Sequence, residues 1–482
     1  MMKKFLSAGL ISLISFPGFA QTEQWEPLQQ SAKKHLLKLV NIDTAQPNAN
    51  ELAAARYMYK ELNKNHIDWD IFIPSKGHAN LMARIKGSDP SQKPLLLISH
   101  LDTVSATPEW NFPPFKATER DGRIYGLGTT DDKNYTAIHL ALFTWLKNQP
   151  QQPKRDIIFL ATSGEEAGSE TGLLWLLGTH WDKINPGFAL NEGGGIINVR
   201  NSTPLVFVEA ATKQYMDVKV TATGEGGHAA LPAQNNAVYT LSQALSKIAA
   251  YDPPAKLTPT ARQFFQAITP IQTEDGKTTI DVLLNGKSVN QQSAAEIMSQ
   301  DPFFRSQLKD VITPTELFAG TDTNVSNKEA SALLNVRLLP GTDPDAFLEQ
   351  LRRLLEEQKN ISLEIVERPQ TPEAPAMDGN DPLFVSIKKT AEKLIPGAIT
   401  VTGMSPASND SEFLRRRGII SYGLGPQMVP LETNAAHSAD EFINEKDFFQ
   451  QLQFLAGVIF DFAYGEELLP LTESTSSTNE MK

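Results

Sequence analysis

Residues 156–168 read DIIFLATSGEEAG, an apolar run that ends in a turn with two adjacent glutamates. A short apolar run bounded by turn residues predicts a buried strand over residues 157–161. Because consecutive side chains of an extended chain point to opposite faces, Glu165 and Glu166 are predicted to do two jobs. One would face a metal ion and the other a substrate water. The alternative is a solvated acidic turn.

The segments around this strand alternate between apolar runs and stretches of helical period. Residues 95–99 and 205–209 predict further buried strands, and residues 51–63 and 135–147 predict helices. Such alternation indicates an α/β sheet covered by helices. Functional loops of these sheets lie at the carboxyl ends of the strands, where the glutamate pair falls.

A different pattern begins near Tyr215 and ends at the proline-rich residues 369–375. It predicts a smaller α+β unit inserted into the first. Strands are expected at residues 216–223, 331–338 and 361–366, and helices at 235–250 and 343–357. The predicted domains are a split catalytic domain of residues 21–213 plus 367–471 and a lid or dimerisation domain of residues 214–366.

The first twenty residues have the pattern of a secretory signal peptide. Lys3 and Lys4 precede an apolar stretch at residues 5–16, and small residues follow. We therefore expect a signal peptide over residues 1–20 and a secreted or periplasmic protein without a membrane attachment after cleavage. Retention as an anchor is the alternative. The polar residues 472–482 predict a disordered tail.

Composition excludes several classes of function. The formal net charge is −12, and loss of Lys3 and Lys4 would make it −14, so a nucleic-acid partner is not expected. Hydrophobic residues make up 40% and charged residues 21%, as in a soluble globular enzyme. Without cysteine, the chain has no disulfide, and any metal ligands must be His, Asp or Glu.

Four more segments carry residues that suit a metal site. His100 ends the predicted strand 95–99, and Asp102 would hold its second ring nitrogen; a structural histidine is the alternative. Asp131 follows a glycine-rich loop and could bridge two cations or cap a helix. Glu192 precedes three glycines, and His437 lies in a loop of small residues.

In this order, the motifs resemble those of the co-catalytic zinc peptidase family that includes aminoacylase, carnosinase, bacterial glutamate carboxypeptidase and secreted N-acyl amino acid hydrolases. The resemblance covers about residues 39–462. It implies an α/β fold, in which a zinc-peptidase catalytic domain with a central mixed sheet flanked by helices is interrupted by an inserted α+β lid or dimerisation domain.

The resemblance also implies two divalent metal ions per subunit, zinc first and cobalt or manganese as alternatives. One ion would be bound by His100, Asp131 and Glu192, and the other by Asp131, Glu166 and His437. Many relatives have Asp where this chain has Glu192. A cis peptide bond between Asp131 and Asp132 is expected.

Further site residues follow from the resemblance. Glu165 would be the general base, and Asp102 would support His100. His228 would be a lid histidine that stabilises the oxyanion and often acts on a neighbouring subunit. Arg337 would bind a substrate carboxylate, although a structural ion pair is equally expected.

Two residues have less specific expectations. Asn324 would line the site. Asp410 would orient His437 or line the pocket, or else cap a helix.

These residues predict a metal-dependent hydrolase that cleaves an amide bond next to a free carboxylate, as a carboxypeptidase or dipeptidase. An aminoacylase-like hydrolase of N-acyl amino acids is the alternative, and a non-catalytic peptide-binding protein is the third hypothesis. The expected substrates are small peptides or N-acyl amino acids, and a homodimer is expected.

Overall fold

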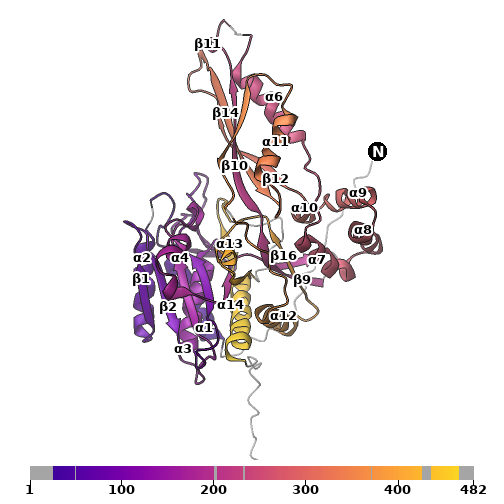
Figure 1. The fold of residues 1–482 in the computed structure, drawn as a ribbon. Helices are drawn as coiled ribbons and strands as arrows, with labels where there is room; N and C mark the ends of the chain where they lie inside the picture. The colour runs from indigo at the N-terminus through magenta and orange to yellow at the C-terminus, as the bar shows by residue number, and fades with distance from the viewer. Residues whose placement is uncertain are drawn as a thin grey trace, which may run out of the picture.

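The computed structural model describes residues 25–465 apart from 49, 200–202, 232–233, 371 and 426–435. The predicted signal peptide and C-terminal tail lie outside the described residues. Two large sheets, each with helices packed against it, make up most of the described chain, and two small sheets of three and two strands accompany them (Figure 1). None of its helices combines the length and the apolar composition needed to cross a bilayer.

The larger sheet has nine strands, with three parallel strands, β6, β3 and β7, side by side near its middle. The pairs β1–β2, β2–β6 and β17–β9 are antiparallel, so the sheet is mixed, as predicted. In spatial order its strands are β1 (Asp68–Phe72), β2 (Asn80–Ile85), β6 (Ile157–Thr162), β3 (Leu95–His100), β7 (Phe188–Asn191), β17 (Ile420–Gly423), β9 (Thr203–Thr212) and β16 (Ile399–Ser405), with β8 (Gly195–Val199) paired to β9.

Both faces of this sheet are covered, because alternate residues of its central strands are apolar on both sides. Leu95 and Leu97 of β3 join one core cluster, and Leu96 and Ile98 join another. The first face packs against α1 (Glu26–Val40), α2 (Glu51–Lys64), α3 (Lys133–Lys147), α12 (Pro382–Leu394) and α14 (Glu445–Ile459). The second packs against α4 (Leu173–Thr179), α5 (Trp181–Ile184) and α13 (Ser411–Arg416).

The smaller sheet is entirely antiparallel and extends away from the larger one (Figure 1). Its strands are β12 (Val311–Phe318), β14 (Glu329–Leu338), β10 (Gln214–Thr223) and β15 (Ile361–Glu367), in that order. Helices α6 (Ala237–Ala250) and α11 (Pro344–Leu354) share its apolar core. Beyond the sheet, β11 (Gly227–His228) pairs with β13 (Val325–Ser326).

Four helices inside the predicted insert pack on the larger sheet instead of the smaller one. They are α7 (Pro259–Ile268), α8 (Glu274–Asn285), α9 (Ser288–Met298) and α10 (Pro302–Leu308). Phe264 and its neighbours form a core with Leu205 and Phe207 of β9 and Val401 of β16. The inserted residues therefore contribute to two cores, and the predicted domain boundaries stay a prediction.

A three-stranded sheet lies beside the site described below. Its strands are β18 (Phe442–Asn444), β5 (Arg123–Tyr125) and β4 (Thr118–Arg120). The pairing of β18 with β5 brings the segment after His437 next to the loop that precedes Asp131.

Candidate metal centre and active site

Candidate ligands follow three neighbouring strands of the larger sheet. His100 is the last residue of β3, Glu165 and Glu166 follow β6, and Glu192 follows β7. These strands are parallel neighbours, so their carboxyl ends share one edge of the sheet. Residues far apart in the sequence thus meet at that edge.

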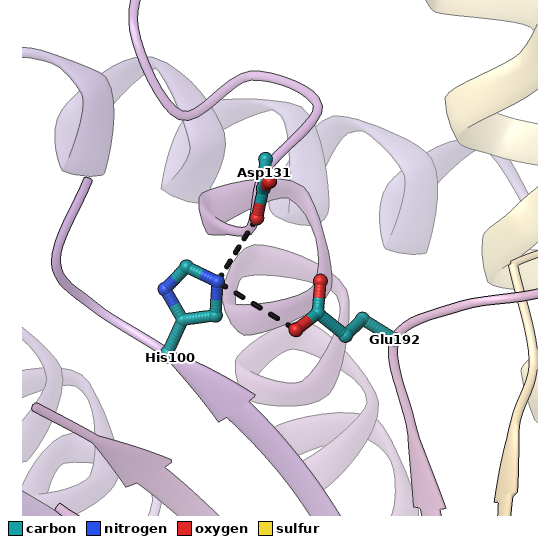
Figure 2. Close-up of side chains that lie close together, drawn as sticks. All are labelled: His100, Asp131 and Glu192. Atoms are coloured by element: carbon teal, nitrogen blue, oxygen red, sulfur yellow. Dashed lines mark hydrogen bonds and ion pairs between the residues drawn. The ribbon is translucent and has the colours of Figure 1, made fainter. Parts of the chain in front are cut away.

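The first group consists of His100, Asp131 and Glu192 (Figure 2). Nε2 of His100 lies 3.0 Å from Oδ1 of Asp131 and 3.8 Å from Oε1 of Glu192. One ligand atom from each residue lies within 4.8 Å of the other two. A ring nitrogen and two carboxylate oxygens converge here on one small volume.

The second group consists of Asp131, Glu166 and His437. Nε2 of His437 lies 3.2 Å from Oδ2 of Asp131 and 3.2 Å from Oε1 of Glu166. Asp131 belongs to both groups, and it presents Oδ1 to the first and Oδ2 to the second. This is the arrangement of a carboxylate that bridges two cations.

The ring of His100 is fixed by its other nitrogen. Nδ1 lies 3.0 Å from the backbone oxygen of Asp102, which can only accept a hydrogen bond, so Nδ1 carries the proton and Nε2 is free to act as a ligand. The prediction assigned this role to the Asp102 carboxylate, which lies farther away, at 3.6 Å. The backbone carbonyl of Asp102 is therefore the nearer acceptor.

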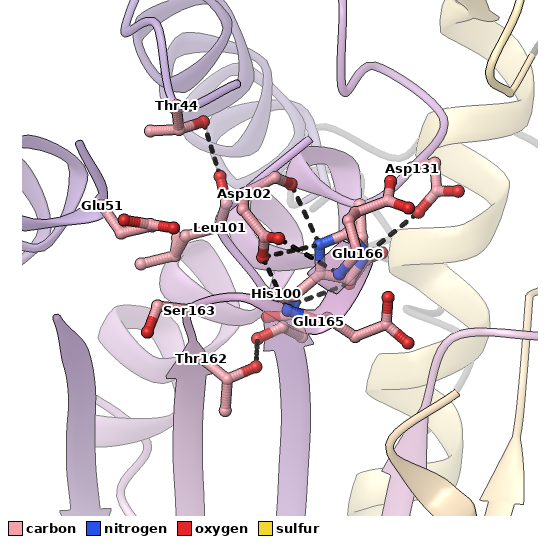
Figure 3. Close-up of polar contacts among 12 residues, drawn as sticks. Thr44, Glu51, His100, Leu101, Asp102, Asp131, Thr162, Ser163, Glu165 and Glu166 are labelled. Carbon is pink, nitrogen blue, oxygen red and sulfur yellow. Dashed lines mark hydrogen bonds and ion pairs between the residues drawn. The ribbon is translucent and has the colours of Figure 1, made fainter. Parts of the chain in front are cut away.

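The Asp102 carboxylate instead holds the glutamate pair (Figure 3). Its Oδ1 accepts the backbone N–H of Glu165 at 3.0 Å, and its Oδ2 accepts that of Glu166 at 3.1 Å. Gln46 Nε2 donates a further hydrogen bond to Oδ2 at 3.1 Å. Asp102 therefore connects the strand that carries His100 to the turn that carries both glutamates.

That turn differs from the extended chain expected from the sequence. Residues Glu165–Ala167 form a 3-10 turn, and the preceding Gly164 has a φ of 68°. A Cβ at Gly164 would lie 2.3 Å from Oγ1 of Thr171, so only glycine fits. The two glutamates separate because the chain turns after β6, and not because of strand alternation.

Burial and mutual repulsion shape the ionisation of the carboxylates. Burial, together with the nearby Asp131, raises the pKa of Glu192 well above its ordinary value. Burial also raises the pKa of Glu165, and the charges of Asp410 and Glu166 add to the rise. Hydrogen bonds with Asp131 and Glu166 raise the pKa of His437 to about 10.

The donor set fits divalent metal ions. Imidazole nitrogens and carboxylate oxygens are ligands for zinc, cobalt and manganese. Within the described part of the chain, no lysine or arginine pairs with Asp131, Glu166 or Glu192. Cations would offset the repulsion between these carboxylates. The cis peptide bond expected between Asp131 and Asp132 is present.

Asp410 lies beneath the glutamate turn. Its buried carboxylate accepts hydrogen bonds from Ser169 Oγ at 2.5 Å and from Thr162 Oγ1 at 3.3 Å. Asp410 occupies the N-cap position of α13, as the helix-cap alternative expects, but its side chain makes no cap hydrogen bond there. Asp410 thus contacts residues on both sides of the glutamate turn, and its described contacts do not include His437.

Arg337 lies where the smaller sheet meets the loop after β16. Its Nη1 donates to Ser408 Oγ at 3.2 Å, and its Nε donates to Asn335 Oδ1 at 3.0 Å. The guanidinium also stacks on Tyr215, 4.6 Å from the ring centroid. Among the described residues it forms no ion pair, and its Nη2 makes no hydrogen bond, so both N–H groups of Nη2 remain for a ligand.

His228 and Asn324 lie together at the far tip of the smaller sheet. Both are exposed, and the N–H of Ala229 donates to the backbone oxygen of Asn324 at 2.9 Å. The β11 label in Figure 1 shows this tip well away from the larger sheet. The structure of this single chain therefore does not bring the two residues to the ligand groups.

Sequence reasoning missed two elements that support the site. Glu441, four residues after His437, is buried and accepts three backbone hydrogen bonds from the loop that carries Asp131. Glu209 and Arg415 form an ion pair at 3.4 Å in which both side chains are fully buried. The partners of Glu441 and Glu209 lie far away in the sequence. The segments around these two glutamates therefore carry no local signal that predicts the contacts.

Removing Arg415 is expected to destabilise the larger unit. The change Arg415→Leu leaves Glu209 buried without its partner, which typically costs about 3–5 kcal/mol. Burial already raises the pKa of Glu209 to about 7, and Arg415 opposes that rise. The unfolded chain loses the Glu209 proton near pH 4.5, whereas the folded variant retains it to higher pH, so the loss of stability should grow from pH 5 to pH 8. Urea unfolding at both pH values measures it.

The exposed Arg417 provides the matched control for this measurement. Its replacement, Arg417→Leu, should change the unfolding free energy by no more than about 0.5 kcal/mol. Equal losses for the two variants, or a loss at position 415 that does not depend on pH, would contradict the role of the buried pair.

Comparison with known proteins identifies the family. The model of peptidase family M20/M25/M40 matches residues 96–461. A probable succinyl-diaminopimelate desuccinylase of Staphylococcus aureus is 29% identical over 86% of this chain and 93% of its own length. The fold resembles human carnosine dipeptidase 1, with a TM-score of 0.65 and 16% identity over 91% of this chain and 98% of that one.

It resembles the metallo-carboxypeptidase Sso-CP2 of Sulfolobus solfataricus to the same degree, with a TM-score of 0.65 and 18% identity over 89% of this chain and 98% of that one. These structural likenesses support the fold. Because the family match spans well over half of its length, the chain belongs to peptidase family M20/M25/M40 and is a metal-dependent hydrolase.

Proposed function

We propose that this hydrolase is a secreted dizinc carboxypeptidase or dipeptidase that cleaves an amide bond next to a free carboxylate. One observation carries the proposal. Asp131 belongs to both ligand groups and presents Oδ1 to His100 and Oδ2 to His437. Two ions bound there would acidify a water molecule and polarise the scissile carbonyl. Cobalt or manganese would suit the same ligands.

In the proposed mechanism, Glu165 moves the proton. It lies next to a ligand, and burial raises the pKa of its carboxyl group, which makes the carboxylate a stronger base. One carboxylate oxygen of Glu165 takes a proton from the attacking water, and the same group then delivers it to the nitrogen of the leaving amine. Asp102 holds the Glu165 backbone, so the carboxylate is positioned before substrate arrives.

Hydrolysis of N-acyl amino acids is the second candidate. The relative with 29% identity is named for removal of a succinyl group, which is an N-acyl substituent. The same two groups of ligands and the same base would serve that reaction. The candidates differ in the acyl side of the substrate, where a peptidase accepts an amino acid and an amidohydrolase accepts an acid without the amine.

A matched substrate panel tests the proposal. It contains dipeptides, the same dipeptides as C-terminal amides, and N-acyl amino acids, each assayed with added zinc and with a chelator. We expect hydrolysis that requires metal and a free carboxylate. A protein that binds two ions and cleaves no member of the panel would instead be a binding protein.

Arg337 is proposed to bind the substrate carboxylate. A charge-assisted hydrogen bond contributes about 1.5–3 kcal/mol, so Arg337→Ala should raise KM by roughly 10- to 100-fold with a smaller effect on kcat. The variant should also discriminate less between a dipeptide and its amide. The exposed Arg353 provides the control variant, Arg353→Ala, which should match the parent protein. An unchanged KM for Arg337→Ala would exclude this role.

A homodimer is proposed through the smaller sheet. Its edge strand β12 has one unpaired side and exposes Leu317 and Phe318, which are 64% and 58% accessible. In a dimer, His228 would be available to stabilise the oxyanion in a neighbouring subunit, with Asn324 beside it. Sedimentation at low concentration tests the assembly. A strict monomer would exclude the homodimer and the role of His228 in a neighbouring subunit.

A further inference from the structure

Asp440 and Glu441 form a second pair of adjacent carboxylates whose side chains bind two different loops. Oδ1 of Asp440 accepts the backbone N–H groups of Asn111 and Phe112 at 2.8 and 3.0 Å. Oε1 of Glu441 accepts those of Thr130 and Asp131 at 2.7 and 3.2 Å. Neither residue belongs to the ligand groups.

Of these two residues, Glu441 is the one that contacts the loop of the metal ligand Asp131. Its side chain is almost fully buried, and its second oxygen, Oε2, accepts the N–H of Gly128 at 3.2 Å. One carboxylate therefore fixes three backbone positions in the four residues that end at Asp131. Because three backbone N–H groups of the loop donate to one buried side chain, this loop has little freedom.

Backbone contacts extend the same connection. The N–H of Gly126 donates to the Glu441 carbonyl at 2.9 Å, and Thr130 Oγ1 donates to the carbonyl of Phe442 at 2.8 Å. Loop 126–131 and segment 436–442 are thus joined at several points. Asp131 lies on the first and His437 on the second, and their side chains meet at 3.2 Å.

The backbone of this segment also requires such support. His437 has a φ of 59° and Asp440 a φ of 57°, in the left-handed region that residues other than glycine seldom adopt. A residue remains in that region only when its surroundings determine its conformation. The hydrogen bonds of Asp440 and Glu441 lie directly after His437 and provide that constraint.

We propose that Glu441 is a positioning residue that sets the placement of Asp131 relative to His437 and thereby the affinity of the second ligand group for its metal ion. The inference rests on the ligands assigned in the proposed function. Glu441 acts through the backbone of Asp131 and touches no reacting atom. A residue that only stabilised the fold would leave the affinity for metal unchanged.

The variant Glu441→Gln tests this role in the full-length protein. The amide retains one oxygen for Thr130 and Asp131 but turns an NH2 group toward the N–H of Gly128, so the loop loses an acceptor. Asp447→Asn is the control, because Asp447 is a buried carboxylate whose described partner is Asn444, outside both ligand groups.

Zinc and cobalt affinities are measured by titration against a chelator, and the absorption spectrum of the cobalt form reports the geometry of the ligands. We expect Glu441→Gln to bind the second ion roughly 10- to 100-fold more weakly, with an altered cobalt spectrum. The first ion should be affected less. Asp447→Asn should bind both ions as the parent does.

The outcomes separate the inference from the proposed function. A parent protein that fails to bind two ions would overturn the ligand assignments and this inference together. If the parent binds two ions and Glu441→Gln has the same affinities and the same cobalt spectrum, the positioning role alone would be wrong. A lower melting temperature with unchanged affinity for both ions would likewise reduce Glu441 to a structural residue.

Discussion

Glu165→Gln is expected to lower kcat by about 10²–10⁴-fold while the protein keeps both metal ions. Glutamine has nearly the same shape but cannot take a proton from water. The backbone N–H of residue 165 would still donate to Asp102, so the turn should keep its conformation. The kcat for a dipeptide and the metal content by elemental analysis provide the two measurements.

Two further variants define what this result means. Glu166→Gln should reduce metal content, because Oε1 of Glu166 belongs to the second ligand group. The exposed Glu170, changed to Gln, should behave as the parent does. If Glu165→Gln lost metal and Glu166→Gln kept it, the roles assigned to the two glutamates would be reversed.

Local patterns were sufficient to predict the elements that carry the site. The apolar runs predicted as strands at residues 95–99 and 157–161 are β3 and β6, and His100 and the glutamate pair lie at their ends. This succeeds because a strand buried on both faces needs a continuous apolar run, which is visible in one short segment. Convergence of the ligands then follows from parallel pairing.

The packing of elements that are far apart in the sequence could not be predicted from local patterns. Helices α7–α10 lie in the predicted insert but share a core with β9 and β16 of the larger sheet. The sequence of an amphipathic helix indicates an apolar face but does not indicate which sheet that face packs against. Contacts in the folded chain, such as the one between Phe264 and Phe207, show which sheet these helices pack against.

The backbone partners of the two supporting carboxylates could not be predicted for a related reason, although Asp102 itself was predicted as a site residue. Asp102 and Glu441 both accept backbone N–H groups from loops distant in the sequence. Every residue type except proline supplies a backbone donor, so these partners are not recognisable from the composition of the loops. The ligands themselves are recognisable because the chemistry of a metal ion restricts them to a few side chains.

Asp131→Asn tests the bridging carboxylate and is expected to have the broadest effect on the site. An asparagine side chain offers one oxygen and an NH2 group, so it cannot serve both groups as Oδ1 and Oδ2 of Asp131 do. We expect no more than one ion per chain by elemental analysis. Loss of several kcal/mol of transition-state stabilisation would lower kcat/KM by at least about 10³-fold.

The neighbouring Asp132 provides a demanding control, because it is buried and lies one residue away from the bridging carboxylate. Its Oδ2 accepts the N–H of His100 at 3.1 Å, and burial raises its pKa well above the ordinary value. Asp132→Asn therefore replaces a buried carboxyl group with an amide of nearly the same shape, whose oxygen still accepts this hydrogen bond. Two ions should remain bound. If Asp131→Asn also retained two ions, the bridging role would be wrong, and the two groups would need separate ligands.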